Sequence, residues 1–464
     1  MNPSTLLKTS AALLAASALA GCMQLAPRYE RPAAPVPATF PNADSAAPAA
    51  SVTDLPWQAY FVDPALRGLI ELALENNRDL RIAVLNIDIA HAQLQLRRAD
   101  RLPTVNAGLA ASRQPGSNGD ITSAYSAGLS VAAYELDLFG RVRSLSDTAA
   151  AQLLSTEEAR KAVHISLVAS VASQYLALAA DDELLDLTQR TLDTRQDSLR
   201  LTRLRFDNGA ASELDLRQAQ TLVEAARATL SQVRRQRELD RNALALLAGQ
   251  ALPELPAGPG RVDAIALADV PSGVPSEVLL RRPDVAQAEQ QLVAANANIG
   301  AARAAFWPRI TLTASAGTAS TQLSDLFKDG VWSFAAQLLQ PIFDAGRNRA
   351  NLAVAEVQRD IAVAQYERAI QAAFRDVADA LAGRATLDEQ LRATQAQADA
   401  EQARFRLSEL RFRNGVSSSL ELLDSQRSLF AVQQAVVQTR LALLQGRVAA
   451  YRALGGGYAS TASK

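Results

Sequence analysis

The sequence predicts an α+β membrane protein in which one unit, made of long helices and a short β-hairpin, occurs twice in tandem. Three observations predict this class: a repeated order of landmarks, paired segments that alternate apolar and polar residues, and helical patterns of about 65 residues. At 464 residues, the chain is too long for an average domain but suits two similar halves.

The tandem repeat is clearest at a turn centred on glycine. The stretch LRFDNGAAS at 204–212 returns as LRFRNGVSS at 410–418, an offset of 206 residues with six of nine residues shared. Four landmarks at nearly one spacing predict an internal duplication. The other three pairs are Asp79 and Asp284, Pro103 and Pro308, and Gly140 and Gly346.

Composition and charge exclude several classes of function. Lys and Arg number 47 against 48 Asp and Glu, so the net charge is −1 and no basic field can hold nucleic acid. Two His and one Cys exclude a disulfide framework and a clustered metal site, and His91 and His164 lie in helical pattern without metal-ligand spacing. The common hydrolase, zinc-protease and phosphate-loop motifs are absent as well. We therefore expect no enzyme activity, no catalytic residue, no metal and no cofactor.

The amino-terminal stretch MNPSTLLKTSAALLAASALAGC has the layout of an export signal. Lys8 precedes an apolar run at 11–20 that is too short to span a bilayer, which takes roughly 20 apolar residues. Residues 19–22, LAGC, look like a bacterial lipobox. We expect 1–21 to be a lipoprotein signal peptide and Cys22 to be lipidated; an ordinary secretory signal with a chance Cys is the alternative. Met23 stands where lipoproteins kept at the inner membrane carry Asp, which favours the outer membrane.

The rest of the chain divides into segments of distinct pattern. Residues 22–62, rich in Pro and Ala, predict an extended amino-terminal strap. The first unit covers 63–248 and the second 281–456; a Pro-rich linker at 249–280 joins them, and 457–464 form a tail. The expected helices lie at about 64–101 (with a break near Asn76 and Asn77), 141–208, 212–248, 282–306, 347–414 and 418–455, and the expected strands at about 104–113, 124–137, 309–318 and 331–342.

The turn residues predict how the long helices end and begin. Gly209 and Gly415 supply the positive φ that ends a helix. Ser212 and Ser418 are then positioned to cap the next helix. Asp63 before Pro64 predicts a helix start of the same kind.

The hairpins predict membrane-embedded strands. Segments of about ten residues with apolar and polar alternation are typical of outer-membrane barrels. Each unit supplies two strands, so one chain supplies four, and four strands leave two open edges that lipid cannot satisfy. Two copies would make eight strands filled by their own side chains, whereas three copies make twelve strands with room for a bore. The pattern therefore predicts a homotrimer around a water-filled pore.

The helical segments predict the wall of a tube. Ile370, Phe374, Val377 and Leu381 are spaced as in a coiled-coil seam, and Ala covers much of the remaining surface, so a neighbour can pack on each side. An ordinary bundle stays open as an alternative. A helix of about 65 residues would be roughly 100 Å long, which argues against the bundle.

With these features, the sequence resembles a known family, the TolC-like outer-membrane efflux proteins, and within it the NodT/OprM-type lipoproteins. The match covers essentially the whole mature chain. The resemblance implies a trimer with a 12-stranded outer-membrane β-barrel, a long periplasmic α-helical barrel and an equatorial belt. It further implies a passive exit duct for drugs or other toxic small molecules, joined through a periplasmic adaptor to an inner-membrane RND transporter. The matching motifs are LAGC (19–22), PRYERPAAPVP (27–37), WQAYFVDPALRGLIELALENNRDL (57–80), YELDLFGRVR (134–143), LLRRPDV (279–285), AFWPRITLTASAG (305–317), PIFDAGRNRA (341–350) and ALGGGY (453–458).

The resemblance also implies two groups of functional residues. Glu421 and Asp424, six and nine positions after Gly415, match acidic residues that ring the periplasmic aperture, and Asp215 holds the equivalent place in the first unit. Taken by themselves, Glu421 and Asp424 more often indicate a solvated acidic face. Ser417 stands where TolC has a basic residue that latches the closed state, so that latch is in doubt here. The hairpin tips that would meet the adaptor contain Arg205, Phe206, Asn208, Gly209, Ser212, Arg411, Phe412, Asn414, Gly415 and Ser418.

Two other functions stay open at this stage. A duct for a type I protein-secretion machine shares the architecture, although the lipobox and the WQAYFVDPAL opening favour efflux. A structural envelope lipoprotein without a pore would explain the helices and Cys22 but not the paired amphipathic hairpins.

Overall fold

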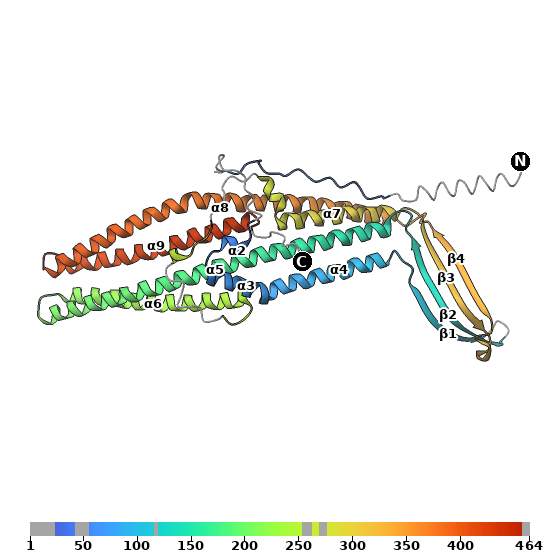
Figure 1. Ribbon diagram of the computed structural model, residues 1–464, viewed down its shortest axis with the longest axis horizontal. Helices are drawn as coiled ribbons and strands as arrows, with labels where there is room; N and C mark the ends of the chain where they lie inside the picture. Colours follow the sequence, from blue (N-terminus) through green and yellow to red (C-terminus); the bar gives the residue numbers. More distant parts are fainter. Residues whose placement is uncertain (1–23, 42–54, 116–118, 253–261, 269–275, 457–464) are drawn as a thin grey trace. The chain divides into compact units, whose positions relative to one another are not determined.

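The computed structural model describes residues 24–41, 55–115, 119–252, 262–268 and 276–456 (Figure 1). The expected signal peptide, Cys22 and the carboxy-terminal tail lie outside the described residues. The described chain forms two compact units, each drawn from both halves of the sequence. One unit takes its residues from the ranges 1–34, 85–158 and 286–368, and the other from 35–84, 159–285 and 369–464.

The first unit contains a four-stranded antiparallel sheet with the order β1-β2-β3-β4. Each half of the sequence supplies one hairpin, and β2 pairs with β3 to join the two hairpins (Figure 1). The strands are β1 Val105–Pro115, β2 Ile121–Leu136, β3 Arg309–Ser320 and β4 Gly330–Leu339.

The register of the sheet places most of the apolar alternating residues on one face, and a β-bulge in β2 between Val131 and Tyr134 brings Tyr134, in place of Ala133, opposite Leu312. Ala314 lies opposite Phe334, and Ala316 opposite Trp332. This face is open to the surroundings, since Trp332 is 81% exposed and Leu109 79% exposed. The other face carries small and polar residues, with the hydroxyls of Ser315 and Ser333 2.7 Å apart. A sheet with one exposed apolar face fits contact with lipid, as the alternation predicted.

Two glycines, Gly128 on β2 and Gly317 on β3, allow these strands to approach closely in the middle of the sheet. Gly128 lies opposite Gly108 on β1 and opposite Gly317 on β3. A Cβ on Gly128 would lie 2.5 Å from the carbonyl oxygen of Ala316, so only Gly fits there. A Cβ on Gly108 would meet nothing within 4 Å.

The strands lead into helices through junctions that both repeats share. After β2, the Asp137 carboxylate accepts hydrogen bonds from the backbone N–H groups of Val142 (3.1 Å) and Arg143 (2.7 Å), at the start of α5 (Arg141–Asp207). After β4, Asp344 accepts one from Asn348 (2.8 Å), at the start of α8 (Arg347–Arg413). Each junction therefore places a carboxylate at a helix amino terminus, where it is favoured.

The amino-terminal strap packs on α7 (Pro283–Ala304) in this unit. The Arg31 guanidinium makes two hydrogen bonds to the Glu289 carboxylate, at 2.7 and 3.0 Å. Asn296 donates to the Pro27 carbonyl at 2.8 Å. A Cβ on Gly300 would lie 2.8 Å from that of Ala26, so this glycine makes room for the strap.

The second unit includes the point where the first expected helix breaks. The expected helix at 64–101 is two helices here, α3 (Pro64–Asn76) and α4 (Arg78–Ala99), with the break at Asn77 that the sequence suggested. Asn77 holds this break by accepting from the Leu80 N–H and donating to the Leu247 carbonyl, both at 2.9 Å. This unit also contains residues 159–207 of α5 and 369–413 of α8. Its other elements are α2 (Trp57–Tyr60), α6 (Glu213–Ala248), α9 (Ser419–Ala453), η2 (Val262–Ala264) and η3 (Ser276–Arg281).

A buried aromatic and ionic core connects distant parts of this unit. The rings of Tyr60 and Tyr451 stack with centroids 4.1 Å apart, and both residues are at most 1% exposed. Arg282, 7% exposed, donates to the Ala453 carbonyl at 2.6 Å and pairs with Asp284 at 2.7 Å. The RRPDV motif thus ties the start of α7 to the end of α9. Ile370, in the expected coiled-coil seam, is fully buried. Burial is expected on the side of a helix that contacts its neighbour.

One helix of the described chain, α5, includes a window of 18 residues that is apolar enough to cross a membrane by composition. Packing accounts for this apolarity, because 56% of the window is buried. Ala172, Leu176 and Ala179 within the helix are fully buried. The apolar surface that fits lipid is therefore that of the sheet.

Replacing Gly128 by Ala should destabilise the sheet, because the new Cβ would meet the backbone of β3. We expect a loss of about 1–3 kcal/mol, the usual cost of overpacking, seen as a lower unfolding midpoint in temperature-dependent gel mobility. Gly108→Ala is the matched control on the neighbouring strand and should leave the midpoint unchanged. Equal midpoints for the two variants would contradict this close-approach argument.

Candidate functional site

The candidate site comprises the two tips where the helical hairpins α5–α6 and α8–α9 turn. The first tip lies between Asp207 and Glu213, and the second between Arg413 and Ser419. Both tips belong to the same compact unit and lie at the same end of their helices (Figure 1).

The backbone of the two tips is nearly identical. Gly209 and Gly415 have φ of 72° and 73°, which confirms the expected left-handed helix ends. Behind each glycine, a backbone N–H closes the turn: Ala210 donates to the Arg205 carbonyl at 2.7 Å, and Val416 to the Arg411 carbonyl at 3.0 Å.

Asparagine side chains complete each helix end in the same way. The Asn208 amide donates to the Leu204 carbonyl at 2.7 Å, and the Asn414 amide to the Leu410 carbonyl at 2.8 Å. The same carbonyls also accept from the backbone N–H groups of these asparagines, at 3.2 and 3.1 Å, so each side chain adds a second hydrogen bond at the helix end. The two asparagines thus have a structural role in addition to any contact with a partner.

The serine caps form as expected, but the two copies differ in detail. In the first tip, the Ser212 hydroxyl accepts from the Asp215 N–H at 3.2 Å, and the Asp215 carboxylate accepts from the Ser212 N–H at 3.0 Å, which is a complete capping box. In the second tip, Ser418 caps the Glu421 N–H at 3.4 Å. The Glu421 carboxylate lies 3.8 Å from the Arg411 guanidinium.

The two tips are joined directly to each other. The Arg205 guanidinium lies 4.2 Å from the Phe412 ring centroid, a cation–π distance, and also donates to the Phe412 carbonyl at 3.3 Å. The Asp215 carboxylate and the Ser419 hydroxyl form a second, short hydrogen bond between the tips. Sequence reasoning missed both contacts, because nothing in either segment specifies its long-range partner.

This joint covers Phe412, one of the residues expected near the contact with a partner protein. Phe412 is only 6% exposed, since its ring is covered within the chain. Its repeat counterpart Phe206 is 37% exposed. Equivalent sequence positions therefore have different environments in the two tips.

The acidic residues near the tips are paired with arginines. The Asp424 carboxylate lies 3.0 Å from Arg404 and 2.5 Å from Arg427. Hydrogen bonds from the Ser212 hydroxyl, the Ser419 hydroxyl and the Ser212 backbone lower the pKa of Asp215, so it stays ionised. Asp215, Glu421 and Asp424 therefore belong to an ion-pair and hydrogen-bond network and are not bare carboxylates.

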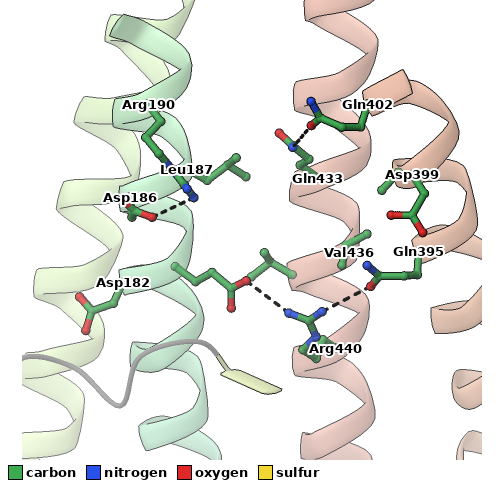
Figure 2. A pocket seen from close by; sticks show the side chains of 13 residues that line it. Asp182, Asp186, Leu187, Arg190, Gln395, Asp399, Gln402, Gln433, Val436 and Arg440 are labelled. Carbon is green, nitrogen blue, oxygen red and sulfur yellow. Dashed lines mark hydrogen bonds and ion pairs between the residues drawn. The ribbon is translucent and has the colours of Figure 1, made fainter. Parts of the chain in front are cut away.

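A polar cavity of about 600 Å³ lies farther along the same helices (Figure 2). Arg440 on α9 reaches Glu183 on α5 at 3.3 Å and Gln395 on α8 at 3.4 Å. On the wall formed by α5, Arg190 pairs with Asp186 at 2.9 Å. Sequence reasoning did not single out this region, although the run DDELLD at 181–186 was its available signal.

The polar side chains that line the cavity hold the neighbouring helices at a fixed spacing, and their arrangement does not indicate catalysis. The Glu183 carboxylate also accepts from the Val262 N–H at 3.0 Å, which fixes η2 against α5. Beside it, burial raises the pKa of Asp181 to about 7, and the neighbouring Asp240 carboxyl adds to this rise. Among the described residues, no group of three or more His, Cys, Asp or Glu side chains could hold a metal ion.

Comparison with known proteins gives concordant matches along the chain. The family model described as outer membrane efflux protein matches residues 69–250 and 274–456, one match in each half. The probable efflux pump outer membrane protein TtgC of Pseudomonas putida is 48% identical over 95% of this chain and 93% of its own length. The outer membrane protein OprJ of Pseudomonas aeruginosa is 45% identical over 96% and 95%.

Solved structures match over the same extent. The MtrE outer membrane channel of Neisseria gonorrhoeae, in its open state, superposes with a TM-score of 0.87 at 42% identity, covering 94% of this chain and 98% of its own. The outer-membrane channel OprN has a TM-score of 0.84 at 30% identity, covering 94% and 99%. Both matches include the helices and the sheet, so the tandem-repeat fold expected from the sequence is confirmed.

Replacing Gly209 or Gly415 by Ala should loosen the tip that it closes. A left-handed residue with a Cβ costs roughly 1–2 kcal/mol, so amide hydrogen exchange should accelerate at the affected helix end. Gly383→Ala in α8 is the control, because a Cβ there would meet only Leu387 at 3.8 Å and helix propensity favours Ala by about 1 kcal/mol. Unchanged exchange in both tip variants would show that the turns tolerate other residues.

Proposed function

Because this chain belongs to the outer membrane efflux protein family, we propose that it is the outer-membrane exit duct of a tripartite RND-type efflux pump. Drugs or other toxic small molecules leave through it passively, without catalysis by the duct itself. The names of relatives support this role: TtgC and ArpC of Pseudomonas putida are named as toluene and antibiotic efflux pump outer membrane proteins. The observation that carries the proposal is an open-edged sheet with an exposed apolar face, followed by two repeated helical hairpins.

The sheet supports assembly as a homotrimer. Within the described chain, β1 and β4 are the outer strands of the sheet, and each pairs with a single neighbour. In lipid, their free backbone groups must be satisfied by strands of other copies. Three copies close a twelve-stranded barrel with a water-filled bore. The small and polar face around Gly128 and Ser315 would line this bore.

The tips support contact with a periplasmic adaptor, which in turn connects to an inner-membrane RND transporter. Gly209, Asn208, Gly415 and Asn414 are exposed, as are the capping serines Ser212 (first repeat) and Ser418 (second). Two tips per chain would give six tips in one ring. Phe412 is left out of the contact because its ring is buried. Lipidation of Cys22 would add an anchor in the same membrane.

Two rival functions make different predictions. A type I secretion duct would require passage of unfolded protein, but similar proteins such as TtgC and SrpC of Pseudomonas putida are named as efflux pump components. A structural lipoprotein without a pore does not explain why Trp332 and Leu109 are exposed on one sheet face.

Deletion of the gene tests the role directly. We expect tolerance to hydrophobic toxicants such as toluene to fall and to be restored by the wild-type gene in trans, while the amount of secreted protein stays unchanged. The purified protein should form ion-conducting pores in planar bilayers. Loss of a secreted protein with normal toxicant tolerance would favour the type I duct, and the absence of conductance would favour the structural lipoprotein.

Replacing Glu421 and Asp424 together by Ala should raise leak conductance and weaken the preference for cations. The change removes carboxylates that pair with Arg411, Arg404 and Arg427. Arg404 keeps its second partner, Glu401, whereas Arg411 and Arg427 lose the carboxylate that offsets their charge. The measurement is single-channel conductance and reversal potential in a salt gradient. A matched double variant, Asp207→Ala with Glu409→Ala, removes two tip carboxylates outside this network. If both double variants behave like the wild type, the aperture assignment is wrong.

A further inference from the structure

The joint between the two tips uses only half of the matching residues in the repeat. It pairs Arg205 of the first repeat with Phe412 of the second. Their counterparts at the offset of 206 are Arg411 and Phe206. These two residues are the same pair of types with the repeats exchanged, and the chain does not bring them together in a joint of this kind.

Both counterparts are accessible. Phe206 is 37% exposed, and the Arg411 side chain is 57% exposed with its guanidinium 3.8 Å from Glu421. The exposed ring is on the first repeat and the exposed guanidinium is on the second. One chain thus presents the cation and the aromatic ring of the same contact on different repeats. Head-to-tail assembly requires two complementary surfaces of this kind.

We propose that Arg411 of each copy stacks on Phe206 of the next copy, so that the contact seen within one chain recurs between chains and closes a ring of six tips. The inference rests on the trimeric duct proposed above. In such a ring, two kinds of junction alternate. One joins the first and second repeats of the same chain, and the other joins the second repeat to the first repeat of the next copy. The partner is a second copy of this chain, recognised by its exposed aromatic ring.

The same correspondence makes the joint between copies weaker than the joint within a chain. Within the chain, Asp215 meets the hydroxyl of Ser419. Between copies, the equivalent positions are Glu421 and Glu213 of the next copy. Two carboxylates replace a carboxylate and a hydroxyl, and they are paired with Arg411 and Arg217, so the hydrogen bond seen within the chain has no counterpart between copies. The seam between copies is therefore the part of the ring that separates first.

Cross-linking tests the proposed contact in the full-length protein. The variant with Phe206→Cys and Arg411→Cys, treated with a short bis-maleimide reagent, should give covalent dimers and trimers on denaturing gels. Each single variant should run as a monomer on the denaturing gel. The single variants also control for cross-linking through the natural Cys22. The pair Arg205→Cys with Phe412→Cys should cross-link within one chain only. A displaced pair, Leu204→Cys with Arg413→Cys, should not link copies.

The assay separates failure of this inference from failure of the proposed function. Light scattering of the untreated protein reports whether it is a trimer. A trimer that yields no cross-linked copies from the 206–411 pair would overturn the tip contact alone. Efficient linkage by the displaced pair would overturn it as well. A monomer would overturn the trimeric duct together with this inference.

Channel recordings test the weak seam. Phe206→Ala and Arg411→Ala should each raise the ratio of open to closed channel roughly two- to fivefold, the factor expected from one exposed cation–π contact. Glu213→Ser should lower the ratio, because it recreates between copies the hydroxyl that Ser419 supplies within the chain. Arg413→Ala removes a nearby tip arginine as a control. If the first two variants leave the isolated channel unchanged and only weaken adaptor binding, these residues serve the adaptor and the proposed contact is wrong.

Discussion

The open edges of the four-stranded sheet are the constraint on which the rest of the molecule depends. Within the described chain, β1 and β4 are the outer strands of an antiparallel sheet whose apolar face is exposed. Hydrocarbon offers no partner for the free N–H and C=O groups of such strands, so they must pair with other copies.

Much of the fold could be predicted from the sequence because its signals are local. A positive φ at Gly209 and Gly415, serine caps after them and a break at Asn77 depend only on the chemistry of a few adjacent residues. Alternation in the strands fixes which side chains share a face, and the observed register places Ala316 beside Trp332 accordingly. Because the unit is duplicated, each of these sequence patterns occurs twice. A pattern that is weak by itself could therefore be interpreted with the support of its second copy.

The contacts between the tips could not be predicted, because they depend on how distant segments meet. Arg205 and Phe412 are 207 residues apart, and either could have faced solvent or another protein. The same limit applies to Glu183, which binds both Arg440 and the backbone of η2. Acidic residues near Gly415 suggested an aperture, but the sequence did not show that Arg404 and Arg427 would compensate Asp424.

The two repeats show which features duplication preserves and which it releases. At the strand-to-helix junctions, Asp137 lies three residues before Gly140, whereas Asp344 lies two residues before Gly346, yet both carboxylates cap the following helix. The requirement is a carboxylate at the helix start, and the chain meets it despite a shift of one residue. Side chains that join one repeat to the other face no such backbone requirement, so they were free to diverge, as Glu213 and Ser419 did. The turns are the same in both repeats, whereas the side-chain contacts between neighbouring tips differ. These differences therefore determine where neighbouring tips in a ring can separate.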